Sequence, residues 1–442
     1  MTLTVTERCN LRCTYCYVPV ARGRTMRPEV LDAALDLFFD RHADEGPLSL
    51  AFFGGEPLLA KDLVWRAMAR AERVEATGQV VRVSTPTNGL ALDAATLAKL
   101  GALGVEVAVS VDGDATSPSR AFASGAPSSS ALWERLPAIV RAIGPRLIAR
   151  MTVTPSNVGD LARGVRALAA VGAARIWYQP AYELDWDDEA IAAWAHEHRR
   201  IAAWLVEERA RGAKVPELAQ WRAIARRLAG ERKGACSAGV TSVAVTTEGA
   251  LAPCYRLVDE ARAVIGDVER GPRADAMAAW AGLDPSDLRG EDGACATCPA
   301  RDGCTHACPA LGFVMTSDVR GVPAAVCRLV RAQVEVVRAH RAHLALRPFA
   351  RPAGPQTRSA AAGAWPAVAA ALVLASSACG GTVAVPAPNA DAAASRDATT
   401  DAADAESPNP FLHDDAGRAE DGGSPDVIGG GGLCPPPPPG LC

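Results

Sequence analysis

The chain is poor in aromatic side chains and has no cluster of positive charge. Phe, Trp and Tyr together make up 5% of its 442 residues, and no run of Lys and Arg is interleaved with aromatics. Proteins that bind nucleic acids need a basic surface, often with aromatic side chains that stack on bases. We therefore expect no nucleic-acid partner.

A secretory signal is also lacking ahead of Cys9, the first of 13 cysteines. The residues before Cys9 do not have the charged and apolar regions of a signal peptide. We therefore do not expect the disulfide framework that is typical of small secreted proteins. The spacing of the cysteines then indicates what they bind.

Three cysteines stand close together near the start of the sequence. Cys9, Cys13 and Cys16 have the spacing C-x3-C-x2-C, and Tyr15 precedes the third. Three thiolates ligate three irons of a four-iron cluster, which leaves one iron open to chelate a small molecule through an amine and a carboxylate. A zinc site or three structural thiols are the alternatives for this triplet.

A second motif lies in residues 48–57, LSLAFFGGEP. It indicates a buried strand that runs into a turn at Gly54 and Gly55. Without Cβ atoms, the backbone at these glycines can approach a ligand closely. The carboxylate of Glu56 only accepts hydrogen bonds, which suits a bound ammonium group. An ordinary Gly-Gly turn is the alternative.

Both motifs resemble the signature of the radical S-adenosylmethionine (radical SAM) enzymes. In that family the three cysteines hold a 4Fe-4S cluster whose open iron binds SAM. One electron from the cluster cleaves SAM to methionine and a 5'-deoxyadenosyl radical, and the GGEP segment hydrogen-bonds the amino group of SAM. The resemblance therefore implies that SAM is a cofactor and that four residues of this segment contact it: Gly54, Gly55, Glu56 and Pro57.

Three more positions match the family. Tyr15 occupies the aromatic position before the third cysteine. Asn88, in segment 85–89 (TPTNG), and Ser110, in segment 109–113 (VSVDG), stand at the ends of two expected strands. The resemblance implies that all three line the SAM site, and ordinary turn chemistry is the alternative for Asn88 and Ser110.

Strand and helix signals alternate through the first half of the chain. Short runs rich in Val, Ile and aromatics predict strands, and apolar spacing of about 3.6 residues predicts the helices between them. The expected strands are 48–53, 80–86, 105–111, 147–153 and 174–180, and the expected helices are 28–43, 61–76, 93–103, 131–143, 157–172 and 186–211. This alternation indicates an α/β fold with a parallel sheet. The resemblance sharpens it to a partial (β/α)6 TIM-like barrel over residues 1–212, followed by a helical linker over 213–235.

Seven cysteines follow in the second half: Cys236, Cys254, then Cys295, Cys298, Cys304 and Cys308 with the spacing C-x2-C-x5-C-x3-C, and Cys327. This pattern resembles a SPASM domain, a C-terminal extension of radical SAM enzymes that usually holds two auxiliary iron–sulfur clusters. The resemblance implies a small cysteine-rich domain over residues 236–346 with a C-terminal helix, and three 4Fe-4S clusters in all. It assigns an outer set, which is Cys295, Cys298, Cys304 and Cys327, and an inner set, which is Cys236, Cys254 and Cys308. Zinc knuckles are the structural alternative.

The inner set is one ligand short. Some relatives have a further cysteine where this chain has Ser242. The inner cluster would then have an open iron for a substrate atom, water or another side chain. His306 lies between Cys304 and Cys308, and we interpret it as a solvated loop residue in preference to a ligand.

The composition changes from residue 347. We expect a linker over 347–359, an apolar segment over 360–379 and a disordered tail rich in Ala, Asp, Gly and Pro over 380–442. The apolar segment is long enough to span a bilayer and has arginines upstream, which predicts membrane association. It also resembles a lipoprotein signal before Cys379, and a flexible linker is the alternative.

SPASM-bearing relatives mostly act on peptides or proteins. They form crosslinks, as in the maturases of ribosomally made peptides (RiPP maturases), or oxidise Cys or Ser to formylglycine. Anaerobic sulfatase maturases place an Asp base directly after the second SPASM cysteine, where this chain has Tyr255. We therefore predict an oxidoreductase that matures peptides and assign no catalytic base. A formylglycine-forming enzyme and a membrane-tethered iron–sulfur electron carrier are the alternatives, although a carrier has no need of a SAM pocket.

The resemblance also implies partners and a location. We expect a peptide or protein substrate and an electron donor of the flavodoxin or ferredoxin type. The chain's own C-terminal tail is a candidate substrate, because Cys434 and Cys442 bracket five prolines as in a modified peptide. Cluster assembly places the catalytic domains in the cytoplasm, and the segment 360–379 would tether them to the inner membrane.

Overall fold

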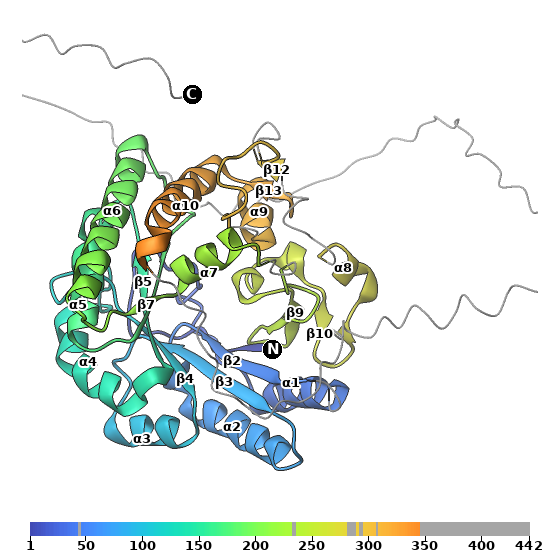
Figure 1. Ribbon diagram of the computed structural model, residues 1–442. Coiled ribbons are helices and arrows are strands. Elements are labelled where there is room, and N and C mark those ends of the chain that lie inside the picture. Colours follow the sequence, from blue (N-terminus) through green and yellow to red (C-terminus); the bar gives the residue numbers. More distant parts are fainter. Residues whose placement is uncertain (43–45, 232–235, 281–288, 291–294, 306–307, 345–442) are drawn as a thin grey trace, which may run out of the picture. The chain divides into compact units, whose positions relative to one another are not determined.

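The computed structural model describes residues 1–344 except 43–45, 232–235, 281–288, 291–294 and 306–307 (Figure 1). Its first half contains six strands that pair in chain order, each parallel to the next. These strands are β1 (Thr2–Thr6), β2 (Leu48–Gly54), β3 (Val81–Thr87), β4 (Glu106–Ser110), β5 (Leu147–Val153) and β6 (Arg175–Pro180). The helices between and after them are α1 (Pro28–Arg41), α2 (Lys61–Glu75), α3 (Ala94–Ala102), α4 (Ser129–Ile143), α5 (Leu161–Ala170) and α6 (Asp188–Ala210).

Buried positions alternate with exposed or half-buried ones along β2, β3, β4 and β6, so one face of each strand packs into the core. Leu50 and Phe52 of β2, for example, are 0% and 1% exposed. Asp93 and Asp187 begin α3 and α6, since their carboxylates accept hydrogen bonds from the first free N–H groups of each helix. Figure 1 shows the helices around the outside of the strands. The predicted partial (β/α)6 barrel is confirmed.

Strand β1 was not among the strands predicted individually. Its sequence is TLTVT, only five residues long, and it ends three residues before Cys9. Leu3 and Val5 are fully buried, and Thr4 and Thr6 are buried as well. A run this short, with three threonines, gives no clear strand signal in the sequence. In the structure β1 is a central strand, paired with β2 and β8.

The cysteine-rich half extends the same sheet beyond β1. Strand β8 (Ala244–Val245) is parallel to β1, and β9 (Ala250–Ala252), β10 (Gly266–Asp267) and β11 (Gly271–Pro272) follow in antiparallel order. At the other edge β7 (Glu217–Leu218) pairs with β6. The other helices of the described residues are α7 (Ala219–Leu228), α8 (Ala274–Ala278), α9 (Pro309–Thr316) and α10 (Ala324–Leu344). Strands β12 (Arg289–Gly290) and β13 (Gly321–Val322) form a separate parallel pair. Short 3-10 helices lie at Pro57–Ala60, Gly144–Arg146, Val158–Asp160, Tyr255–Leu257 and Ala261–Ala263.

Helix α10 returns to the barrel and packs against α6. The indole Nε1 of Trp194 donates to the carbonyl of Leu329 at 3.0 Å. His198 is fully buried, with Nδ1 2.7 Å from the carbonyl of Trp194 and Nε2 3.1 Å from the amide of Gln333. These contacts join the last helix of the barrel to the last described helix of the chain.

Three predicted segments lie outside the described residues: the linker 347–359, the apolar segment 360–379 and the tail 380–442. His306 does as well. Across the part of the chain that the structure describes, every helix is too short or too polar to cross a membrane.

Burial lowers the pKa of His198 to about 4, which predicts a loss of stability in acid. The unfolded chain binds a proton at His198 near pH 6.5, whereas the folded chain binds it only near pH 4. The stability that this residue contributes is complete above pH 6.5 and is lost as the pH falls toward 4. At about 1.4 kcal/mol per pKa unit, the full loss is up to about 3 kcal/mol.

Urea unfolding at several pH values checks this expectation. His198→Gln should show a shallower loss of unfolding free energy between pH 6.5 and 4.5 than the wild type. His196→Gln is the control, because His196 is exposed on the same helix, and it should follow the wild type. Parallel curves for His198→Gln and the wild type would contradict the prediction.

Candidate active site

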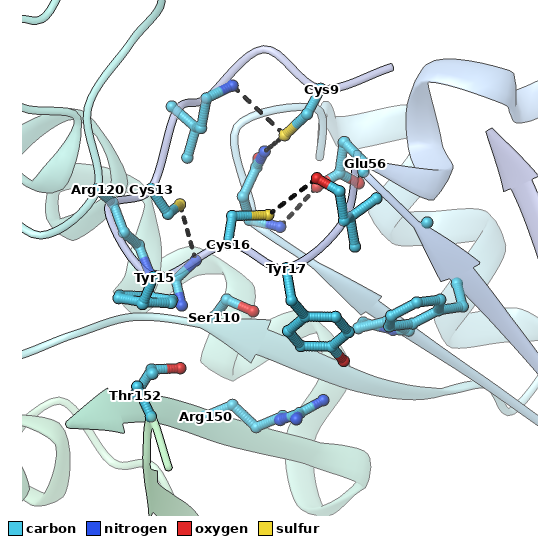
Figure 2. A pocket seen from close by; sticks show the side chains of 18 of the residues that line it. Cys9, Cys13, Tyr15, Cys16, Tyr17, Glu56, Ser110, Arg120, Arg150 and Thr152 are labelled. Atoms are coloured by element: carbon cyan, nitrogen blue, oxygen red, sulfur yellow. Dashed lines mark hydrogen bonds between the residues drawn. The ribbon is translucent and has the colours of Figure 1, made fainter. Parts of the chain in front are cut away.

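A pocket lies at the carboxyl ends of the parallel strands (Figure 2). It encloses about 980 Å³, including solvent at its mouth. The residues predicted for the cluster and SAM from the first half of the sequence all line it: Cys9, Cys13, Tyr15, Cys16, Gly54, Gly55, Glu56, Pro57, Asn88 and Ser110. The structure thus brings together residues from the loop after β1 and from the ends of β2, β3 and β4.

Two backbone hydrogen bonds connect the loop before Cys9 to the turn after β2. The N–H of Gly55 donates to the carbonyl of Thr6, and the N–H of Glu56 donates to the carbonyl of Arg8, both at 2.9 Å. A Cβ added at Gly54 would lie 1.9 Å from the Thr6 oxygen, and one at Gly55 would lie 2.4 Å from the Arg8 oxygen. The two glycines are therefore needed for the protein's own backbone, where the sequence suggested the approach of a ligand.

The carboxylate of Glu56 stabilises this turn. Glu56 is buried and only 1% exposed. One carboxylate oxygen accepts from the N–H of Leu58 at 3.1 Å and the other from the N–H of Asn88 at 2.6 Å. Burial raises the pKa of Glu56 to about 6. The carboxylate ties the end of β2 to the end of β3, so an ammonium group would have to share oxygens that already serve backbone donors.

The three cysteines near the start line one cavity. Burial raises the pKa of Cys9 and raises that of Cys13 to about 11, while Cys16 is exposed. Asn88 holds the loop through a 2.7 Å hydrogen bond from its amide to Asn10. Among the described residues, no three His, Cys, Asp or Glu side chains converge on a single-ion site. A four-iron cluster does not require the thiolates to converge on one point, because each cysteine binds a different iron around one cavity.

Ser110 has an important neighbour that the sequence analysis missed. Ser110 and Arg150 are direct partners in the register of β4 and β5, and both line the pocket. Figure 2 shows Ser110 with Arg150 and Thr152 below it in the view. A hydroxyl beside a guanidinium is a good donor set for a carboxylate. No motif marks Arg150, because only strand pairing brings it to Ser110.

The cysteine-rich half supplies another part of the pocket wall. Arg256 forms an ion pair with Glu183 and lies over the ring of Tyr17, 5.3 Å from its centroid. Tyr255 packs on Phe53 with ring centroids 5.0 Å apart. Arg256 stands two residues after Cys254, and that proximity is the signal that sequence reasoning missed.

The later cysteines lie close to one another in two groups. Burial raises the pKa of Cys254 to about 12, and the charges of Cys308 and Cys236 act in the same direction. Burial raises the pKa of Cys327 to about 11, and the charges that add to this come from Cys295, Cys304 and Cys298. The two groups have the same members as the inner and outer sets of the sequence analysis, and their role as ligands remains a prediction.

Sequence comparison gives a family match for the first part of the chain. Residues 3–161 match the Radical SAM superfamily. A GTP 3',8-cyclase of Desulforamulus reducens is 34% identical over 91 residues, which are 20% of this chain and 26% of that protein. A PqqA peptide cyclase of Xanthomonas euvesicatoria pv. vesicatoria is 43% identical over 61 residues, which are 14% of this chain and 16% of that protein. The matches thus span about a quarter or less of these relatives.

Solved structures match a larger part of the fold. Native anSMEcpe with bound AdoMet and Cp18Cys peptide has a TM-score of 0.64 at 17% identity, and the match covers 77% of this chain and 98% of that chain. Streptococcus suis SuiB has a TM-score of 0.51 at 14% identity, covering 74% and 76%. At these identities the likeness shows a common fold.

The close backbone contact at Gly55 predicts that adding a single methyl group at this position lowers the stability of the fold. Gly55→Ala should lower the free energy of unfolding by about 1–3 kcal/mol, because the new Cβ meets backbone oxygens that cannot move without opening the turn. Urea unfolding measures this loss. Gly159→Ala is the control, since its Cβ would meet no atom within 4 Å, and it should change stability by less than about 0.5 kcal/mol. Equal effects of the two variants would show that the turn is not tightly packed.

Proposed function

We propose that this chain, whose residues 3–161 match the Radical SAM superfamily, is a radical SAM enzyme that modifies a peptide or protein. One observation supports it most directly. The three cysteines, the Gly-Gly turn and the polar strand ends that the superfamily signature singles out line one pocket. The pocket has the donors that a cluster and an amino-acid-like ligand need.

The residues fit these two groups. Cys9, Cys13 and Cys16 would hold a 4Fe-4S cluster with one open iron. When bound there, SAM supplies a 5'-deoxyadenosyl radical that removes a hydrogen atom from a substrate C–H bond. Ser110 and Arg150 would bind the carboxylate of SAM, and the turn at Gly54–Glu56 would face its amine. The rings of Phe53 and Tyr17, whose centroids lie 6.2 Å apart, would form an aromatic wall beside the reacting carbon.

Two auxiliary clusters belong to the same proposal, which treats the cysteine-rich half as a SPASM domain. The outer set would ligate one cluster fully, and the inner set of Cys236, Cys254 and Cys308 would leave one iron open. Arg256 lines the pocket and also interacts electrostatically with Cys308. A substrate in the pocket would therefore lie between the SAM site and the inner set.

The proposed substrate is a peptide, and the proposed product carries a crosslink or an oxidised residue. A peptide cyclase is among the curated relatives, and a solved structure of similar fold contains a peptide. The terminus with Cys434 and Cys442 remains a candidate substrate, and a flavodoxin- or ferredoxin-type protein is the proposed electron donor. Formylglycine formation is less favoured, because position 255 carries a tyrosine that packs on Phe53 and has no carboxylate to act as a base.

Release of 5'-deoxyadenosine tests the proposal. Enzyme reconstituted without oxygen and reduced with dithionite should convert SAM to 5'-deoxyadenosine, measured by liquid chromatography. Replacing Cys9, Cys13 and Cys16 together by Ala should abolish the product, since no cluster then delivers the electron. Arg150→Ala should raise the KM for SAM by about tenfold, which corresponds to about 1.4 kcal/mol of lost carboxylate binding.

Arg150→Lys keeps the charge but loses the bidentate geometry, so it should fall between the wild type and Arg150→Ala. Product formation by the triple cysteine variant at the wild-type rate would rule out the radical SAM assignment. An unchanged KM in Arg150→Ala would remove only the carboxylate role of Arg150.

Iron content tests the auxiliary clusters. The reconstituted wild type should hold about twelve irons, four in each of three clusters. Cys298→Ala should lower this by about four and reduce solubility, because a bound cluster also stabilises the fold around it. Cys379→Ala, outside both sets, is the control and should retain the wild-type content. Stoichiometric zinc without iron in protein purified anaerobically would contradict the assignment.

A further inference from the structure

A buried charge network lies directly beneath the cysteine loop and takes no part in the proposed reaction. Asp112 is 3% exposed and Arg120 is 8% exposed. Arg120 Nε lies 3.0 Å from one oxygen of Asp112, which also accepts from the hydroxyl of Tyr15. The other oxygen accepts from the N–H of Thr152 at 2.7 Å. Asp112 is thus saturated and fixed, and it holds Arg120 in one orientation.

The guanidinium of Arg120 points at a cysteine thiol. Its Nη1 lies 3.8 Å from Sγ of Cys13, and the group lies 5.4 Å from the ring centroid of Tyr15. Figure 2 shows Arg120, Tyr15 and Cys13 side by side, with the contact to sulfur drawn. Arg120 is therefore a cation in direct contact with the sulfur of Cys13.

The backbone fixes this distance as well. The segment around Arg120 accepts two hydrogen bonds from the cysteine loop, from the N–H of Arg12 to Ala121 at 2.7 Å and from the N–H of Thr14 to Ser119 at 3.4 Å. Leu11 and Phe122 form a β-bridge beside them. The two segments are joined along their backbones, so the backbone of Arg120 stays beside the cysteine loop, and Asp112 orients its side chain.

The two charges act on Cys13 with unequal strength. Arg120 is cationic, because a guanidinium keeps its proton in proteins. Arg120 is in contact with Cys13, and Asp112 lies behind it. Nη1 of Arg120 lies 3.8 Å from Sγ of Cys13, and the carboxylate of Asp112 pairs with Nε of the same guanidinium. In a buried site such charges are screened weakly.

We propose that Arg120 is a positioning residue that raises the reduction potential of the cluster bound through Cys13, and that Asp112 limits this increase. The inference rests on the proposed function, because it requires a cluster at the cysteine loop. Reduction adds one electron from an external low-potential donor to the cluster and breaks no bond in the protein. The cluster becomes more negative by one charge, and a fixed cation at its thiolate stabilises that form.

A potentiometric titration of the full-length holoenzyme tests the inference, with electron paramagnetic resonance as the readout. The signal to follow is the part that changes when SAM is added, since this part belongs to the SAM-binding cluster. Arg120→Gln should lower the ratio of reduced to oxidised cluster by about tenfold at the wild-type midpoint, a shift of about 59 mV for one electron. Asp112→Asn should shift the midpoint in the opposite direction, and Arg120→Lys should restore it toward the wild type.

Arg163→Gln is the matched control. Arg163 also pairs with an aspartate, Asp114, which stands two residues after Asp112, but the side chain of Arg163 is 48% exposed, so the midpoint should not change. Shifts of Arg120→Gln and Asp112→Asn in the same direction, or no shift in either, would overturn the inference alone. If Arg120→Gln loses its iron, Asp112→Asn becomes the test: a raised midpoint supports the inference, and an unchanged or lowered midpoint overturns it. A wild type without any SAM-responsive signal would overturn the proposed function and this inference with it.

Discussion

The pair of backbone hydrogen bonds between residues 6–8 and 54–56 is the constraint on which the site depends. It holds the chain that enters the cysteine loop against the turn after β2. Only glycine at positions 54 and 55 permits this approach, because any Cβ there would overlap backbone oxygens. The carboxylate of Glu56 then connects the same turn to β3. These contacts fix the start of the cysteine loop directly before Cys9.

The same strand end also connects the two halves of the chain. Strand β1 pairs with β2 on one side and with β8 of the cysteine-rich half on the other. Just beyond it, buried Glu7 pairs with Arg24 at 2.7 Å, and Arg24 also pairs with Glu248 of the second half at 2.7 Å. The cysteine loop is therefore held from both sides, which suits a site whose wall includes Arg256.

Much of the site could be predicted from the sequence because local motifs encode it. The cysteine spacing, the GGEP segment and the polar residues at the strand ends are short patterns, and the apolar strands produce the barrel that gathers them. Arg120 and Arg150 could not be found in this way, because each reaches the pocket through a partner far away in the chain, namely the cysteine loop and Ser110. Arg256 had one local signal, its place two residues after Cys254. The sequence also could not show why Gly54 and Gly55 must be glycine, because the reason is their contact with the backbone at the end of β1 and just after it.

The central claim is that SAM binds an open iron in this pocket through its amine and carboxylate. Electron–nuclear double resonance of the reduced enzyme measures it directly, with isotope labels in the amino nitrogen and the carboxylate oxygens of SAM. We expect magnetic coupling of both labels to the cluster held by Cys9, Cys13 and Cys16. Bound SAM with neither label coupled to a cluster would contradict it.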